Sequence, residues 1–280
     1  MSSELLGVVF GLTAAASWGA GDFSGGLASR RSPVYVVVIG SGAVGLLLLV
    51  GMALLLAEPL PLLVDLAWGF SAGIAGALGL AALYRGLAAG RMGVVAPMAA
   101  VVTATIPLVF GLLLEGVPAA QQLLGFGVAL VAVWLISRTG GGARVQVREL
   151  ILPLLAGLGF AFFLVAIGRV SETAVLWPLV AAKFSSLVAV LVVAALARQW
   201  QRVDAGQVPL MALAGLLDTG GNAFYALAAR AGRLDTAAVL SSLYPAATVL
   251  LARLLVKEQI ARTQWLGVIA ALLAVVLIAS

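Results

Sequence analysis

The chain has 280 residues, of which 63% are hydrophobic and only 10% are charged. Its mean hydropathy is +1.18. A soluble domain needs more polar surface than this composition supplies, so the solvent of this protein is lipid. Lipid permits a helical bundle or a closed barrel, because the backbone must satisfy its own hydrogen bonds. The apolar runs are roughly 18–24 residues long and do not alternate, which excludes a barrel and predicts helices that cross about 30 Å.

The chain contains no cysteine and no histidine. This excludes thiol catalysis, disulfides, histidine acid–base chemistry and the usual zinc sites, so we expect no cofactor and no bound metal. The net charge of +5 resides in short loops and does not indicate nucleic-acid binding. The first residues, MSSELLGVVF, lack a basic stretch and a cleavage site, so we expect the first apolar run to be retained.

Short polar breaks divide the chain into ten apolar runs, which predict ten transmembrane helices. In chain order the predicted spans are 4–27, 34–57, 66–89, 92–114, 120–137, 150–169, 174–197, 207–229, 235–256 and 262–279. No loop is long enough to form a domain. We therefore expect the function to lie within the membrane-embedded part.

The segments that end the two halves of the chain, 83–137 and 224–280, read as copies of each other. Pairs that match at an offset of 142 residues (233 − 91) are Gly90 with Gly232, Arg91 with Arg233, Leu124 with Leu266 and Gly125 with Gly267. Because each copy would cross the membrane five times, the two copies must be inverted relative to each other. We predict a first repeat at 1–138, a flexible glycine-containing linker at 139–149, and a second repeat at 150–280.

Basic residues are distributed unequally over the predicted loops. Loops after odd-numbered spans hold 12 arginines and lysines, counting those near helix ends, and loops after even-numbered spans hold 3. Basic loops face the cytoplasm, so this count predicts that both termini lie outside. The expected location is the inner membrane of a prokaryotic cell.

Several short patterns occur in corresponding places of the two halves. They are Gly11 with Ser17-Trp18-Gly19, the stretch from Tyr84 to Glu115 with Ala96-Pro97, Leu124-Gly125, Tyr244-Pro245, Lys257-Glu258 and Leu266-Gly267. Together they resemble the drug/metabolite transporter superfamily, specifically its EamA-type members. The likeness covers nearly the whole chain, and its specificity lies in the combination of ten spans, duplication and the two repeat tails.

The resemblance implies an all-α integral membrane protein with two inverted five-helix repeats around a central cavity. Spans 1–4 and 6–9 would line the cavity, and spans 5 and 10 would be peripheral. It also implies export or exchange of small metabolites, amino acids or drugs. Many members of the superfamily place both termini in the cytoplasm, and the charge count here indicates the opposite.

Charged residues inside apolar spans are costly, so each points to a function or to a buried partner. Asp218 lies near the middle of the eighth span, Lys183 near the middle of the seventh, and Asp22 nearer the end of the first. Asn222 follows Asp218 by four residues and shares its helix face. The first copy has Gly76 at the position of Asp218 (218 − 142), so the shared fold does not require this carboxylate.

We predict that Asp218 binds a proton or a cation in the cavity; the alternative is a structural pair with Lys183. Lys183 either holds a substrate carboxylate and tunes Asp218, or serves only as a buried partner. Asp22 is a further cavity candidate, with exposure to water at the helix end as its alternative. Glu115 and Glu258 end the fourth and ninth spans, either as cap charges or as gate charges beside an arginine.

Aromatic rings can line a cavity that accepts an apolar or cationic solute, and they also anchor helices at the membrane interface. The cavity candidates are Trp18, Tyr84, Trp177, Tyr225 and Tyr244. Prolines interrupt helical hydrogen bonding and provide either hinges or ordinary kinks. The hinge candidates are Pro97, Pro107, Pro178 and Pro245.

These observations predict a secondary transporter, either an exporter, an exchanger or a facilitator, for a small organic solute such as an amino acid, an amine or a drug. Its partners would be the solute, the lipid bilayer and protons as a candidate coupling ion. The alternatives are a membrane scaffold or accessory subunit that transports nothing, and an intramembrane enzyme. An enzyme would need clustered acids, a nucleophile or metal ligands, and no helix carries paired carboxylates. The sequence does not predict the oligomeric state.

Overall fold

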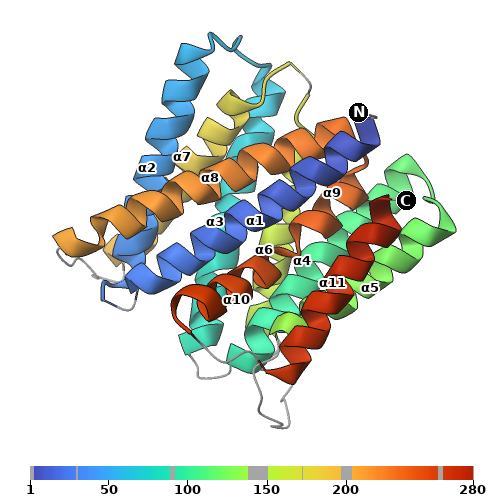
Figure 1. Ribbon diagram of the computed structural model, residues 1–280. Coiled ribbons are helices and arrows are strands. Elements are labelled where there is room, and N and C mark those ends of the chain that lie inside the picture. The colour runs from blue at the N-terminus through green and yellow to red at the C-terminus, as the bar shows by residue number, and fades with distance from the viewer. Residues whose placement is uncertain are drawn as a thin grey trace.

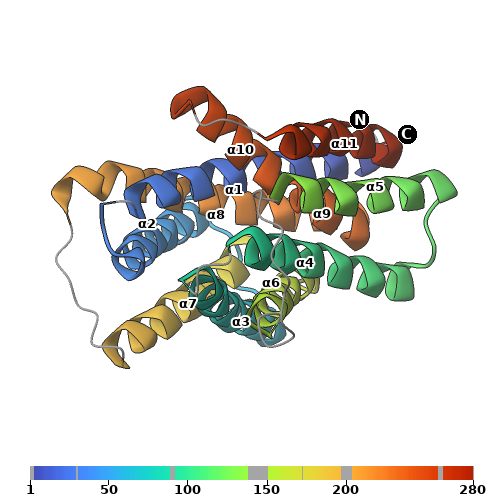
Figure 2. The same cartoon turned by 90° about the horizontal axis from the view of Figure 1, so that it is seen from below.

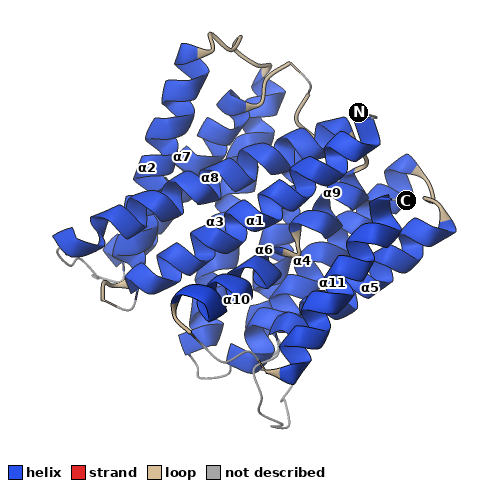
Figure 3. Cartoon of the chain, in the orientation of Figure 1, coloured by secondary structure: helices blue, strands red, loops and turns tan. Residues whose placement is uncertain are grey.

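The computed structural model describes residues 3–29, 31–88, 92–137, 151–171, 173–196, 204–257 and 261–279. Within these ranges every regular element is a helix, as the sequence predicts (Figure 3). The first repeat contains α1 (Ser3–Ser29), α2 (Val34–Leu55), α3 (Leu63–Ala88), α4 (Met92–Glu115) and α5 (Ala120–Ser137). The second contains α6 (Ile151–Gly168), α7 (Leu176–Leu196), the short η2 (Ala205–Gln207), α8 (Val208–Ala231), α9 (Leu234–Ser241), α10 (Tyr244–Leu255) and α11 (Arg262–Ala279). Figure 1 shows these helices along the chain.

The predicted ninth span differs from the other nine because it is broken. It consists of α9 and α10, which are separated by Ser242 and Leu243, and Pro245 lies in the first turn of α10. Proline has no backbone N–H to continue the preceding helix, which gives the break a local cause. By contrast, α4 continues through Pro97 and Pro107, and Pro178 lies in the first turn of α7.

Length and hydropathy support membrane insertion. Six helical segments among the described residues are long and apolar enough to cross a membrane: Glu4–Ser29, Val34–Leu55, Leu63–Ala82, Ile151–Gly168, Leu176–Leu196 and Leu234–Leu255. Shorter apolar helices cover Val101–Glu115, Ala120–Ile136 and Arg262–Ile278. The 24-residue helix α8 is in neither group. It carries Asp218, Asn222 and Arg230, which lower its hydropathy.

The packing of α5 against α11 shows that the two repeats are inverted. A Cβ added at Gly125, near the start of α5, would meet Ile278 at the end of α11. A Cβ added at Gly267, near the start of α11, would meet Ile136 at the end of α5. These two contacts exchange under the offset of 142 residues, as contacts do across a two-fold axis. The two helices therefore run antiparallel around a pseudo-two-fold axis.

The interhelix contacts nearer the middle of the protein repeat in the same way. Helix α1 packs extensively against α8, and its counterpart α6 packs extensively against α3. Helix α2 packs against α8, and its counterpart α7 packs against α3. A Cβ at Gly215 would meet the backbone of Ser41, and a Cβ at its equivalent Gly73 would meet the backbone of Ala182. Small residues thus permit close backbone approach at both junctions.

Seen from below, the helices form a layered bundle (Figure 2). Helices α1 and α8 lie side by side, with α10 and α11 on one flank and α3, α6 and α7 on the other. Both chain ends lie at the end of the bundle where α1 begins (Figure 1). We call this end the termini face. It contains loops 56–62, 116–119 and 232–233 and the described loop residues 169–171 and 173–175.

Candidate functional site

Two opposite charges, Lys183 and Asp218, meet near the middle of helices α7 and α8. The Lys183 ammonium on α7 donates a hydrogen bond to the Asp218 carboxylate on α8 and forms an ion pair with it. The Lys183 side chain is 13% exposed and the Asp218 side chain is 49% exposed. The structure therefore unites the two mid-span charges that the sequence singles out and leaves the carboxylate accessible.

Asp22 adds a second carboxylate to this region. It follows Gly21, where an added Cβ would lie 3.2 Å from the backbone nitrogen of Asp218. The Asp22 charge is close enough to interact with Asp218 and with Tyr244. Its side chain is exposed. With both acids ionised, the cluster carries a net charge of −1.

One turn away from the ion pair, three predicted site residues form a buried contact. The Trp18 indole Nε1–H donates to the Asn222 Oδ1 over 3.1 Å. The rings of Trp18 and Tyr225 lie 5.8 Å apart, a normal distance for an aromatic pair. The Tyr225 hydroxyl donates to the Leu164 carbonyl oxygen over 2.8 Å, and its side chain is fully buried. Trp18 and Asn222 thus border the charged cluster, and Tyr225 anchors α8 to α6.

The other predicted aromatics are more scattered. Trp177 lies at the start of α7 and donates through Nε1 to the Glu58 carbonyl oxygen over 3.1 Å. Tyr244 begins α10, and its carbonyl oxygen packs against Gly19 of α1. Tyr84 lies in α3, but its side chain is outside the described part of the structure, as is that of Pro97.

A further polar atom lies near the ion pair. The Thr219 hydroxyl is buried and has no hydrogen-bond partner among the described protein atoms. A Cβ added at Gly45 of α2 would lie 3.3 Å from Cε of Lys183 and would collide with this hydroxyl. Gly45 therefore makes room for both side chains. No group of three acidic, histidine or cysteine side chains that could hold a metal occurs among the described residues.

The charged cluster occupies only one of two equivalent places in the fold. Trp18 packs on Gly221, and its counterpart Phe160 packs on Gly79, the counterpart of Gly221. Under the same offset Asp218 corresponds to Gly76, Asp22 to Leu164 and Lys183 to Ser41. The backbone packing is thus duplicated, but the charges are not.

Sequence reasoning missed a polar network at the termini face, although it weighed Glu115 as a gate charge beside an arginine. The Glu58 carboxylate accepts hydrogen bonds of 2.8–3.0 Å from the backbone nitrogens of Val175, Leu176 and Trp177, at the start of α7. The buried Asp65 carboxylate accepts from the nitrogen and hydroxyl of Ser171. The signal in the sequence was the presence of acidic residues in or beside the predicted loops that hold few arginines and lysines.

A second part of this network surrounds Arg233. Its guanidinium donates to the carbonyl oxygens of Glu115 and Gly116 and pairs with the buried Asp235 at 2.7 Å. The hydrogen bonds that the guanidinium donates to the Asp235 carboxylate raise the pKa of Arg233 above its ordinary value, so the guanidinium stays charged. The Glu115 carboxylate accepts from the backbone nitrogen of Leu234 at the start of α9. Glu258 lies outside the described residues.

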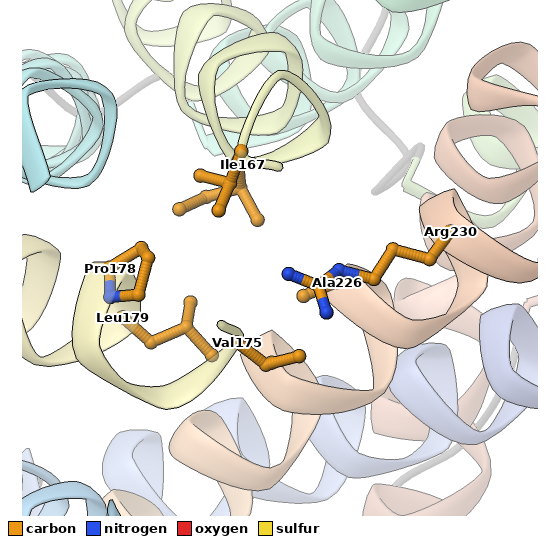
Figure 4. Close-up of a pocket in the computed structure, with 7 residues that line it drawn as sticks. Ile167, Val175, Pro178, Leu179, Ala226 and Arg230 are labelled. Carbon is orange, nitrogen blue, oxygen red and sulfur yellow. The ribbon is translucent and has the colours of Figure 1, made fainter. Parts of the chain in front are cut away.

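Two hollows lie away from the charged cluster. One, between α6, α7 and α8, has about 10 Å³ of free space, enough for about one water molecule. Arg230 points into it among Ile167, Val175 and Pro178 (Figure 4). The other is an open apolar depression of about 520 Å³ between α3 and α7, lined by Phe70, Trp177 and Phe184 among others. The central cavity around Asp218 stays a prediction.

The fold and its mid-span charges define a class of protein: a polytopic helical membrane protein with duplicated, inverted halves. Comparisons with known proteins agree. Residues 147–280 match the model of the EamA-like transporter family, which is part of the drug/metabolite transporter superfamily. The resemblance seen in the sequence is thereby confirmed, and the family is one of transporters.

A solved structure titled "Crystal structure of protein" shares the fold over nearly the entire chain. It superposes with a TM-score of 0.80 at 14% sequence identity, and the match covers 97% of this chain and 95% of that chain. At this identity the likeness establishes the fold alone. No curated protein sequence matches the chain.

Proposed function

We propose that the protein is a secondary transporter that moves a small organic solute through the membrane by alternating access. Residues 1–138 and 150–280 act as two repeats that move against each other, and 139–149 joins them. The solute lies between the repeats, beside the charges of α1, α7 and α8. The match of residues 147–280 to the EamA-like transporter family and the duplicated, inverted packing support this proposal.

The single observation that carries the site is the accessibility of Asp218 and Asp22. Both carboxylates lie within predicted transmembrane spans, and both have exposed surface. A carboxylate that faced lipid there would cost several kcal/mol, so the exposed surface faces water or solute. These acids therefore line an aqueous crevice between helices.

In the proposed mechanism Asp218 alternates between two partners. It pairs with Lys183 when the site is empty, and it binds a proton or a cationic group of the solute when the site is loaded. Lys183 is then available for an anionic group of the same solute. Trp18 and Asn222 hold the wall of the site in place. A facilitator that transports without a coupling ion would use the same residues.

The test is solute flux in proteoliposomes that contain the purified full-length chain. A thermal-stability screen against amino acids, nucleobases, amines and drugs first selects ligands, because a ligand that binds the native state raises its apparent stability. Flux of a selected ligand should depend on pH and should lose that dependence in Asp218→Asn. Unchanged pH dependence in Asp218→Asn would contradict proton coupling at this residue. Absence of flux for every bound ligand would favour a scaffold.

A further inference from the structure

The two ends of the bundle differ in how they join the repeats. At the termini face, Glu58 and Asp65 of the first repeat bind the loop before α7 in the second. At the same face, Glu115 of the first repeat binds the start of α9. Each contact links residues that are more than a hundred positions apart and belong to different repeats. The termini face is therefore tied shut by three carboxylates.

Two of the three carboxylates have no counterpart at the opposite face. Under the offset of 142 residues, Glu58 corresponds to Trp200 and Asp65 to Gln207, and neither carries a carboxylate. Glu115 falls on Lys257, next to Glu258, which lies outside the described residues. The two repeats therefore differ in sequence at positions that form these contacts.

The hydrogen-bond donors at the equivalent positions of the opposite face have other partners or no side-chain cap. Ser29, the counterpart of Ser171, donates its hydroxyl to Gly25 of its own helix over 2.8 Å. The start of α2, the counterpart of the start of α7, is preceded by Pro33 and has no side-chain cap. At the start of α7 the Glu58 carboxylate accepts from three backbone nitrogens, whereas the equivalent start of α2 has no side-chain cap.

Packing at equivalent positions shows the same difference. Leu164, in the half of α6 nearer the termini face, is 4% exposed, whereas its counterpart Asp22 in α1 is exposed. A Cβ at Gly168 would collide with Leu234, whereas a Cβ at its counterpart Gly26 would meet nothing within 4 Å. At these two pairs of described positions, the packing is closer towards the termini face than towards the opposite face.

We propose that Glu58, Asp65 and Glu115 form a latch that closes the termini face and holds the protein open towards the opposite face. Opening the termini face requires these carboxylates to release the starts of α7 and α9 and the loop before α7. The orphaned N–H groups at a helix start carry partial positive charge, so a carboxylate is a well-suited reversible partner. The latch rests on the proposed movement of the repeats, and it predicts which residues control that movement.

Cysteine accessibility tests the latch without any solute. The chain has no native cysteine. The reporter is Ala226→Cys, which lies in the small hollow beneath the loop before α7 and is 5% exposed in the closed state. The full-length protein is reconstituted in liposomes and labelled with a membrane-impermeant maleimide. Labelling from the termini face should be slow, and Glu58→Gln should accelerate it about tenfold, because charge-assisted bonds are lost.

The matched control is Asp204→Asn, which removes a carboxylate that accepts from the backbone nitrogen of Gly206 in its own loop at the opposite face. This variant should leave the labelling rate unchanged. An equal acceleration in Asp204→Asn would overturn the proposal, because it would indicate general loosening. So would unchanged labelling in a folded Glu58→Gln/Glu115→Gln double variant.

A milder variant keeps the test decisive if the carboxylate variants do not fold, which thermal unfolding would reveal as the absence of a cooperative transition. Ser171→Ala removes the hydroxyl bond to Asp65, together with a contact to the Thr173 hydroxyl in the same loop, and should accelerate labelling about threefold; no acceleration would overturn the latch. Failure of the proposed function would appear differently. If Glu58→Gln accelerates labelling but the protein moves no ligand, the latch is supported and the proposed transport function is contradicted.

Discussion

The α1–α8 and α3–α6 interfaces use the same backbone packing with different chemistry. In the first, Trp18 packs on Gly221, and Asp218 lies against Gly21. In the second, the equivalent contacts are Phe160 on Gly79 and Gly76 against Phe163. An aromatic ring on a glycine is common to both. The charges belong to the first alone.

This difference separates what the fold requires from what is specific to the site. The α3–α6 interface shows that a glycine and a ring suffice to pack these helices. Asp218, Asp22 and Lys183 are additions whose mates are Gly76, Leu164 and Ser41. Buried and half-buried charges in a membrane are costly, so charges that packing does not need indicate function.

Replacing Asp218 of the α1–α8 interface by the residue at the equivalent position of the α3–α6 interface should strongly reduce transport. In Asp218→Gly, the residue found at the mate position replaces the carboxylate. Flux of a bound ligand should fall about 10- to 100-fold, as expected from loss of a charge-assisted interaction of about 1.5–3 kcal/mol. Proteoliposome flux is the measurement, with Asp204→Asn as a control that keeps its flux. Full flux in Asp218→Gly would show that this charge is dispensable.

The glycines that both junctions share should be sensitive for steric reasons. Gly215→Ala and Gly73→Ala each press a Cβ against the backbone of a neighbouring helix. Each should lower the free energy of unfolding by about 1–3 kcal/mol, because a packed interface does not yield easily. Thermal unfolding in detergent measures this loss. Gly26→Ala and Gly51→Ala are the controls, since an added Cβ meets nothing at either position, and similar losses in all four would refute the packing argument.

The sequence predicted most of the fold because its elements are local. Apolar length alone placed the helix ends within a few residues, and the duplicated tails predicted the inversion. The break between α9 and α10 was only suggested by Pro245. Whether a proline breaks a helix depends on neighbours: α4 continues through Pro107, which is fully buried, and the chain before α10 does not.

The candidate site was predicted in part. Opposite charges near the middle of neighbouring spans pointed to the Lys183–Asp218 pair. The contact of Trp18 with Asn222 was not predicted, because it joins helices 204 residues apart. The latch was missed for the same reason: Glu58 and Asp65 read as ordinary loop acids until α7 and its preceding loop are placed beside them.

The ion pair can be tested by replacing both members with their mates. Lys183→Ser and Asp218→Gly should each destabilise the protein, since each leaves one charge without its partner. The double variant should be more stable than the sum of the two losses predicts, with a coupling of about 0.5–3 kcal/mol. A double-mutant cycle of thermal unfolding measures the coupling. Strict additivity would mean that the two groups do not interact.

The pseudo-two-fold contact between α5 and α11 gives the smallest effect. Gly125→Ala and Gly267→Ala should each cost about 1 kcal/mol, because each adds a Cβ beside an isoleucine of the other helix. The two losses should agree within about 0.5 kcal/mol, since the contacts are equivalent. Gly127→Ala, which meets nothing, is the control. A loss at only one of the two glycines would contradict the symmetry.

The central claim is that the two halves are inverted copies, and one topology measurement tests it directly. Gln121 and Thr263 are exposed residues at the starts of α5 and α11 and are equivalent under the offset of 142. Single cysteines at these positions are labelled with a membrane-impermeant maleimide in sealed vesicles, before and after the vesicles are opened. The inverted arrangement predicts that one cysteine is labelled from outside and the other only after opening. Labelling of both from the same side would contradict it.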